Sequence, residues 1–173
     1  MRNLKKIISE EEIARRVNTL AEAIQRDYEG GELLIICVLS GSIVFLADLI
    51  RKLDLSLRLD MISVSSYRDK SRKPSRLKFL KMFSEDVRGK HVLVIDDICD
   101  TGATLKEILR RIDRMSPASV KSCVFLNKTI RRACELEPDY IGFDVGEGFV
   151  VGYGLDFDGR FRNLPYVAEV IEE

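Results

Sequence analysis

The chain has 173 residues, the size of one domain, and such a chain can bury roughly 70% of the surface that it exposes when unfolded. Its 28 lysines and arginines balance 28 aspartates and glutamates, so the net charge of zero argues against a general nucleic-acid-binding protein. The four cysteines form no C-x-x-C pair, which predicts reduced thiols and a cytoplasmic location. No apolar run approaches the roughly 18 residues of a membrane span, so we expect no membrane association.

The first predicted elements are an amphipathic helix and a buried strand. Ser9 and Glu12 match a capping box, and apolar residues then recur at helical spacing from Ile13 to Ile24. Residues 33–39 form a continuous apolar run of strand length. The same patterns predict helices at residues 43–53 and 105–112, and strands at about residues 57–65, 77–83, 91–95, 120–126, 140–145, 149–155 and 167–171.

One long loop interrupts this alternation. Residues 66–76, SYRDKSRKPSR, have no apolar periodicity and carry five basic residues against the single acid Asp69. The composition predicts a mobile, solvated loop.

The alternation of apolar strands with amphipathic helices predicts an α/β fold with a mainly parallel sheet. In such open sheets the ligand lies outside the carboxyl ends of the strands. Three polar clusters follow predicted strands: residues 40–42 (Ser-Gly-Ser), the pair Asp96 and Asp97, and the pair Asn127 and Lys128. We therefore expect all three clusters to face one crevice.

The stretch VLVIDDICDTGATL, residues 92–105, combines acids with a phosphate-binding pattern. A helix beginning near Thr101 to Thr104 offers unpaired N–H groups and two hydroxyls to a phosphate, and Gly102 allows close backbone approach. Ionised Asp96 and Asp97 can accept hydrogen bonds from a vicinal diol and can attract Mg²⁺. Together these features predict a ligand like ribose 5-phosphate. Receiver domains of response regulators also pair acids after a strand, but near their amino terminus.

The same stretch closely resembles the phosphoribosyl pyrophosphate signature of type I phosphoribosyltransferases. Three further motifs, Ser66-Tyr67, Asn127-Lys128 and FVVGYGLDFDGRFRNLPYV at residues 149–167, resemble the hypoxanthine-guanine branch in the same order. The resemblance implies the type I phosphoribosyltransferase fold, a mainly parallel twisted sheet flanked by helices, with a mobile lid at about residues 66–76 and a small purine-covering hood. It implies a single domain over residues 1–173.

The resemblance also implies roles for the acids and the phosphate loop. Asp96 and Asp97 would hold the ribose hydroxyls and take part in binding Mg²⁺. Asp100 would face nitrogen 7 of the purine as general base or acid. The 5-phosphate would be bound by a loop of five residues: Asp100, Thr101, Gly102, Ala103 and Thr104.

Purine and pyrophosphate contacts follow from the other motifs by the same matching. Lys128 would donate to the 6-oxo group, Phe149 would stack on the ring, and Val150 would meet its edge through the backbone. Asp156 would contact both purine and metal. The pyrophosphate would be bound by Arg162 and by Ser40 and Gly41, in a turn where many members carry a lysine and a cis peptide. The lid would contribute Ser66 and Tyr67.

The implied reaction joins hypoxanthine or guanine to phosphoribosyl pyrophosphate, with Mg²⁺ as cofactor, and yields IMP or GMP plus pyrophosphate. Family resemblance also implies a homodimer or homotetramer, while the balanced charge and the short apolar runs predict that it binds neither nucleic acid nor membrane. Two alternatives remain open on the sequence alone. One is a regulatory RNA-binding protein on the same scaffold, against which the balanced charge argues, and the other is a sibling enzyme that prefers xanthine.

Overall fold

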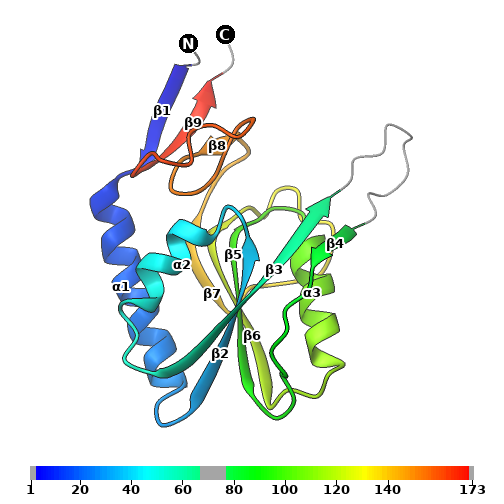
Figure 1. Ribbon diagram of the computed structural model, residues 1–173. Coiled ribbons are helices and arrows are strands. Elements are labelled where there is room, and N and C mark those ends of the chain that lie inside the picture. The colour runs from blue at the N-terminus through cyan, green and yellow to red at the C-terminus, as the bar shows by residue number, and fades with distance from the viewer. Residues whose placement is uncertain (1–2, 67–76, 172–173) are drawn as a thin grey trace.

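The computed structural model describes residues 3–66 and 77–171 (Figure 1). Tyr67 and most of the predicted lid lie outside these residues. The helices are α1 (Glu10–Asp27), α2 (Ile43–Ile50) and α3 (Ala103–Asp113). The strands are β1 (Asn3–Ile8), β2 (Glu32–Leu39), β3 (Ser56–Ser66), β4 (Leu77–Lys81), β5 (His91–Cys99), β6 (Ser119–Asn127), β7 (Tyr140–Asp144), β8 (Val150–Val151) and β9 (Val167–Ile171).

The main sheet has six strands in the order β4-β3-β2-β5-β6-β7. All neighbouring pairs are parallel except β3 and β4, which confirms the predicted mainly parallel sheet. The chain passes from β2 outward to β3 and returns to the other side of β2 as β5. The strand order therefore reverses between β2 and β5, which is where open α/β sheets bind ligands.

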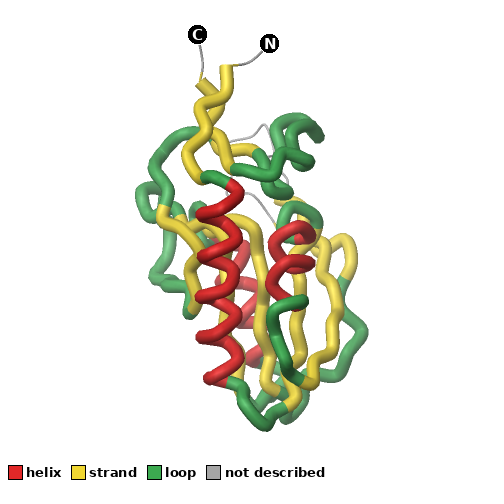
Figure 2. Tube along the Cα trace, turned by 90° about the vertical axis from the view of Figure 1, so that its left-hand side faces the viewer, coloured by secondary structure: helices red, strands yellow, loops and turns green. Residues whose placement is uncertain are grey.

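Both faces of the sheet are buried, as parallel sheets require. Along β2, Leu33, Ile35 and Cys37 belong to the core that packs on α1 and α2. The alternate residues, Leu34 and Ile36, belong to a second core, which packs on α3. Figure 2 shows α1 and α2 side by side on one face of the sheet. This two-sided burial explains why the strand sequences are continuous apolar runs.

The start of α1 is fixed by the capping box that its sequence predicts. The side-chain oxygen of Ser9 accepts a hydrogen bond from Glu12 N (3.2 Å), and Ser9 N donates to Glu12 Oε2 (2.7 Å). Two backbone donors at the helix start are thereby satisfied.

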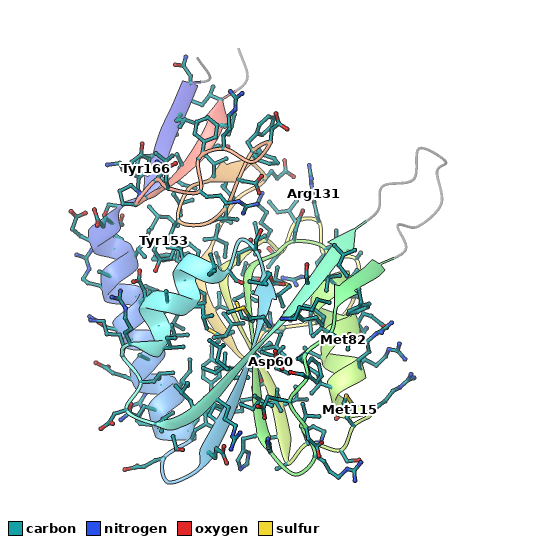
Figure 3. All side chains as sticks on the ribbon, viewed as in Figure 1. Asp60, Met82, Met115, Arg131, Tyr153 and Tyr166 are labelled. Carbon is teal, nitrogen blue, oxygen red and sulfur yellow. The ribbon has the colours of Figure 1, made fainter. Side chains whose placement is uncertain are left out.

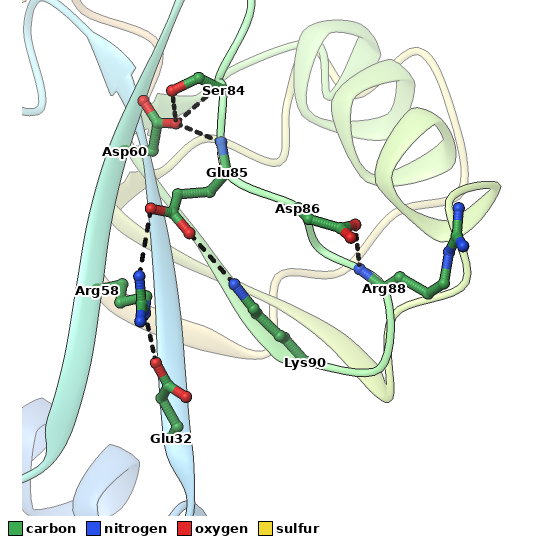
Figure 4. A network of polar contacts seen from close by, with 8 residues as sticks. All are labelled: Glu32, Arg58, Asp60, Ser84, Glu85, Asp86, Arg88 and Lys90. Atoms are coloured by element: carbon green, nitrogen blue, oxygen red, sulfur yellow. Dashed lines mark hydrogen bonds and ion pairs between the residues drawn. The ribbon is translucent and has the colours of Figure 1, made fainter.

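The segment between β4 and β5 is fastened to β3 by a polar network (Figure 4). Asp60 Oδ2 accepts hydrogen bonds from the backbone N–H groups of Ser84 (2.6 Å) and Glu85 (2.9 Å). Glu85 forms ion pairs with Arg58 (3.7 Å) and Lys90 (3.2 Å). These contacts fix the point at which the chain enters β5, the strand that carries the acid pair.

A second, three-stranded sheet of order β1-β9-β8 forms the hood above the carboxyl ends of the main strands (Figure 1). β9 pairs antiparallel with both β1 and β8. The sequence patterns predict β9 but not β1, and β8 is shorter than the predicted strand at residues 149–155. The observed α2 ends at Ile50 rather than Leu53, and β5 runs on to Cys99 instead of stopping at residue 95.

None of the helices in the described ranges combines the length and the hydropathy that a membrane span requires.

Candidate active site

The predicted polar clusters meet at one edge of the main sheet. Residues 40–42 follow β2, and Lys128 follows β6. Asp96 and Asp97 lie within the last part of β5, not after it as expected. Because β2, β5 and β6 are adjacent parallel strands, these side chains converge beneath the hood. The prediction of a single crevice is consistent with this arrangement.

The turn after β2 lies against the acid pair. Its first peptide bond, between Leu39 and Ser40, is cis, as the resemblance implied. A Cβ atom at Gly41 would overlap Asp97 Oδ2 and lie 2.7 Å from Asp97 Cγ. The Asp97 carboxylate therefore rests directly on the Gly41 backbone, and only glycine leaves room for it.

Asp96 and Asp97 form a desolvated pair of acids. The exposed fraction of Asp96 is 7%. Asp97 N donates to Asp96 Oδ1 (3.0 Å), and Ile98 N donates to Asp97 Oδ1 (2.7 Å). Burial raises the pKa of Asp96, which the neighbouring Asp97 raises further, and burial also raises the pKa of Asp97. The pair is thus suited to a ligand that brings hydroxyl donors or a cation.

This desolvation predicts a gain of stability in Asp96→Asn. The pKa of Asp96 is higher in the folded than in the unfolded state, so its ionisation lowers the free energy of unfolding. This loss of stability is absent below the unfolded pKa of about 3.9. The loss grows as the pH rises from that value toward the folded pKa. We therefore expect Asp96→Asn to raise the Tm at neutral pH by a few degrees. Calorimetry as a function of pH checks this: the gain should vanish near pH 3, and a lower Tm at pH 7 would contradict it.

The phosphate loop has the geometry of an anion site at a helix start. Gly102 is the N-cap residue of α3, with φ of 79°, a left-handed conformation that suits glycine. Lys106 N donates to Gly102 O (2.9 Å), so the first N–H groups of α3 point out of the helix beside Thr101 and Thr104. Thr101 is itself anchored from behind, because its carbonyl accepts from Ala133 N (2.9 Å). The N–H groups and hydroxyls of this loop can bind a phosphate.

Asp100 is the first residue of this loop and follows Cys99, whose carbonyl accepts a hydrogen bond from Lys128 N. Its Oδ1 is buried, and within residues 3–66 and 77–171 it has no hydrogen-bond partner. Such an oxygen is costly unless a ligand donates to it. Asp100 also acts on the ammonium of Lys128: burial lowers the pKa of this lysine, and the negative charge of Asp100 partly opposes that effect. An acceptor and a donor are therefore presented side by side to a planar ligand.

Lys128 is fixed by hydrogen bonds from both its backbone N–H and its side-chain ammonium. Its exposed fraction is only 8%. Its backbone N donates to Cys99 O (2.9 Å), and its Nζ donates to Gly148 O (2.6 Å). Burial lowers the pKa of this lysine. The ordinary alternative for a lone lysine, a solvated surface position, is excluded by this burial.

Phe149 offers an exposed aromatic ring directly after the carbonyl that Lys128 Nζ binds. It follows Gly148 directly and is 51% exposed. Its ring meets Phe157 edge to face, with centroids 5.1 Å apart and an interplanar angle of 77°. The neighbouring Val150 is buried in the core. An exposed ring braced at its edge is suited to stacking on a flat base.

The carboxyl-terminal motif folds back on the turn after β2. Arg162 Nη2 pairs with Asp156 Oδ1 (2.7 Å), and Arg162 Nη1 donates to Gly154 O (2.6 Å). A Cβ at Gly154 would overlap the carbonyl oxygen of Gly41. The charge of Arg162 lowers the pKa of Asp97, against the effect of burial. Arg162 therefore lies where it can meet an anion bound over Gly41.

Tyr153 ties this motif to α2. Its hydroxyl donates to Asp48 Oδ2 (2.7 Å), and Figure 3 shows it between the hood and the helix. Neither this contact nor the close approach of Gly154 to Gly41 was predicted from the sequence. The same is true of Glu169, which β9 places beside Gly148. The available signal was a charged residue within the short apolar strand VAEVI.

Comparison with known proteins agrees with this geometry. The family model of the phosphoribosyl transferase domain matches residues 4–158, so the chain belongs to the phosphoribosyltransferase family. Within it, the chain is 41% identical over 167 residues to the hypoxanthine-guanine phosphoribosyltransferase of Aquifex aeolicus (strain VF5), covering 96% of this chain and 94% of that protein. The enzyme of the same name from Lactococcus lactis subsp. lactis (strain IL1403) is 39% identical, with 94% and 88% covered.

A solved structure supports the same assignment. The crystal structure of a hypoxanthine-guanine phosphoribosyltransferase from Bacillus anthracis superposes with a TM-score of 0.91 at 40% identity. It covers 99% of this chain and 100% of that one. The predicted type I phosphoribosyltransferase fold is thereby confirmed.

Proposed function

We propose that the chain is a purine-salvage transferase that joins hypoxanthine or guanine to phosphoribosyl pyrophosphate, yielding IMP or GMP and pyrophosphate. The observation that carries this proposal is the buried Lys128 beside Asp100, next to a phosphate-binding helix start. A lysine that can only donate suits a 6-oxo group and not the 6-amino group of adenine. Asp100, with a buried oxygen, suits the acceptor role at nitrogen 7.

The sugar phosphate is proposed to lie between the acid pair and α3. Asp96 and Asp97 would accept hydrogen bonds from the ribose hydroxyls. The 5-phosphate would sit on the loop from Asp100 to Thr104. Ser40, Gly41 and Arg162 would bind the pyrophosphate, whose charge suits a guanidinium. Ser66 and Tyr67 are proposed to belong to the lid.

The donor set fits Mg²⁺ shared with substrate. Within the described residues there is no group of three or more His, Cys, Asp or Glu side chains that could hold a metal ion alone. Mg²⁺ usually keeps several waters and is bound through one or two carboxylates plus substrate phosphates. The desolvated Asp96 and Asp97 are such carboxylates, and Asp156 would contribute through water beside the purine. When bound, the ion would neutralise charge on the departing pyrophosphate.

An assay with a panel of bases tests the proposal. Purified protein is incubated with phosphoribosyl pyrophosphate, Mg²⁺ and labelled hypoxanthine, guanine, xanthine, adenine or uracil. Nucleotide is expected from hypoxanthine and guanine. A clear preference for xanthine would support the sibling enzyme. Formation of no nucleotide from any base would refute both enzyme hypotheses and favour the regulatory RNA-binding protein.

Lys128→Ala should affect the base more than the sugar phosphate. Loss of the donor to the 6-oxo group is expected to raise the KM for hypoxanthine by about 10- to 100-fold, since a hydrogen bond from a charged group contributes about 1.5 to 3 kcal/mol. The KM for phosphoribosyl pyrophosphate should change less than twofold. Steady-state kinetics, with the exposed Lys52→Ala as control, measure both constants. Equal losses for the two substrates would count against the 6-oxo contact.

We further propose that the chain acts in the cytoplasm as a homodimer or homotetramer and that it folds as a single domain. The free state of all four cysteines is consistent with a reducing compartment.

A further inference from the structure

Charged groups from three parts of the fold act on Lys128. Asp100 faces it from the segment after β5, Arg131 from its own loop, and Glu169 from β9. The two acids favour the charged ammonium and Arg131 opposes it. Figure 3 shows Arg131 pointing away from the sheet, toward the level of the hood. Within the part of the chain that the structure describes, the buried lysine thus faces two anions and one cation.

Glu169 reaches the lysine region through a contact that needs glycine. It pairs across the strands with Val150, so its side chain lies on the same face of the hood sheet as Val150, which belongs to the core that packs on α1 and α2. A Cβ at Gly148 would overlap the Glu169 carboxylate and lie 2.7 Å from Glu169 Cγ. Gly148 is also the residue whose carbonyl accepts the Nζ bond of Lys128. The same peptide therefore has the carboxylate packed on its Cα and the ammonium bonded to its oxygen.

The carboxylate lies at the wall of a cavity of about 370 Å³ between α1, β7 and the hood. Glu147 and Gly148 line this cavity together with Glu169. Glu147 is exposed, and it is not among the charges that act on Lys128. The wall of this cavity thus carries four acids, Glu12, Asp144, Glu147 and Glu169, of which only Glu169 acts on the lysine.

We propose that Glu169 is a positioning residue for the purine base: its carboxylate holds the Lys128 ammonium charged and directed at the 6-oxo group. The inference rests on the proposed function. Asp100 cannot do this alone, because its own charge changes when it exchanges a proton with nitrogen 7. Glu169 belongs to neither the acid pair nor the phosphate loop, and its carboxylate takes no part in the proton exchange between Asp100 and nitrogen 7.

The pH dependence of hypoxanthine use tests the proposal with Glu169→Gln. The kcat/KM should fall as Lys128 loses its proton, and removal of a negative charge lowers the pKa of that lysine. The fall of kcat/KM on the alkaline side of the pH profile, the alkaline limb, is therefore expected to move to lower pH by roughly half to one unit. In that pH range the KM for hypoxanthine should be about 3- to 10-fold higher than in the wild type. The kcat and the KM for phosphoribosyl pyrophosphate should stay within about twofold. Ionisation of hypoxanthine itself affects both proteins equally.

Three further variants make the test specific. Glu147→Gln removes the neighbouring acid and should leave the limb where it is. Glu169→Asp keeps the negative charge and should therefore bring the alkaline limb most of the way back to its wild-type position. Gly148→Ala keeps the carboxylate but displaces it, and should reproduce the Glu169→Gln profile; it decides the matter if Glu169→Gln does not fold.

The outcomes separate this inference from the proposed function. If the wild type forms IMP but the limb is unmoved in Glu169→Gln, or in Gly148→Ala when it alone folds, Glu169 has no positioning role. An equal shift in Glu147→Gln would also overturn the inference, because it would reveal a general charge effect. If the wild type forms no nucleotide from any base, the proposed function itself fails.

Discussion

Gly41→Ala is expected to lower kcat/KM for phosphoribosyl pyrophosphate by about 100-fold or more. The added Cβ would overlap Asp97 Oδ2, and since Asp97 Cγ is only 2.7 Å away, rotation of the carboxylate cannot remove the clash. Either the carboxylate or the turn after β2 must move. Misplacement of a binding group by about 1 Å can cost 10²-fold in rate. One methyl group would thus disturb both the Asp97 carboxylate, proposed to bind the ribose, and the turn after β2, proposed to bind the pyrophosphate.

Gly31→Ala is the matched control for this variant. Its Cβ would meet Tyr28 O at 3.5 Å, an ordinary van der Waals distance, and it lies at the opposite edge of the sheet, before β2. Initial rates and calorimetric binding of phosphoribosyl pyrophosphate should be those of the wild type in Gly31→Ala. A Gly41→Ala enzyme with the wild-type KM for phosphoribosyl pyrophosphate would contradict the close contact between Gly41 and Asp97.

The parts of the site that were predictable from the sequence are local patterns. The acid pair in β5 and the glycine at the start of α3 each depend on residues that are adjacent in the chain. Their convergence follows from a general rule, since parallel strands bring their carboxyl ends to one edge. Identification of Lys128 needed the resemblance, because a lysine after a strand is ordinarily a solvated residue.

The parts that were missed depend on contacts between distant segments. β1 contains two adjacent lysines and is stabilised by pairing with β9 at the far end of the chain. Local periodicity carries no information about such a partner. The same holds for Gly154 against Gly41 and for Gly148 against Glu169, where each glycine is required by a group remote in sequence. The contacts that form the hood therefore could not be predicted from local sequence patterns.

Asp100→Asn is expected to slow turnover by about 10-fold or more while fold and sugar-phosphate binding are retained. The amide matches the carboxylate in size, so the segment between β5 and α3 should keep its conformation. It cannot take up a proton from nitrogen 7, and general base or acid catalysis typically contributes 10²- to 10⁴-fold. Among the described residues Oδ1 of Asp100 has no hydrogen-bond partner, so the substitution breaks no contact between them.

Single-turnover rates with hypoxanthine and titrations with phosphoribosyl pyrophosphate separate the two parts of this prediction. Asp113→Asn, an exposed position at the end of α3, provides the control for the loss of one negative charge. It should leave both measurements unchanged, since Asp113 is remote from the start of the same helix. Unaltered turnover in Asp100→Asn would remove the proton-transfer role and leave Lys128 as the main recognition element for the base. Loss of sugar-phosphate binding in Asp100→Asn would instead show that this side chain organises the phosphate loop.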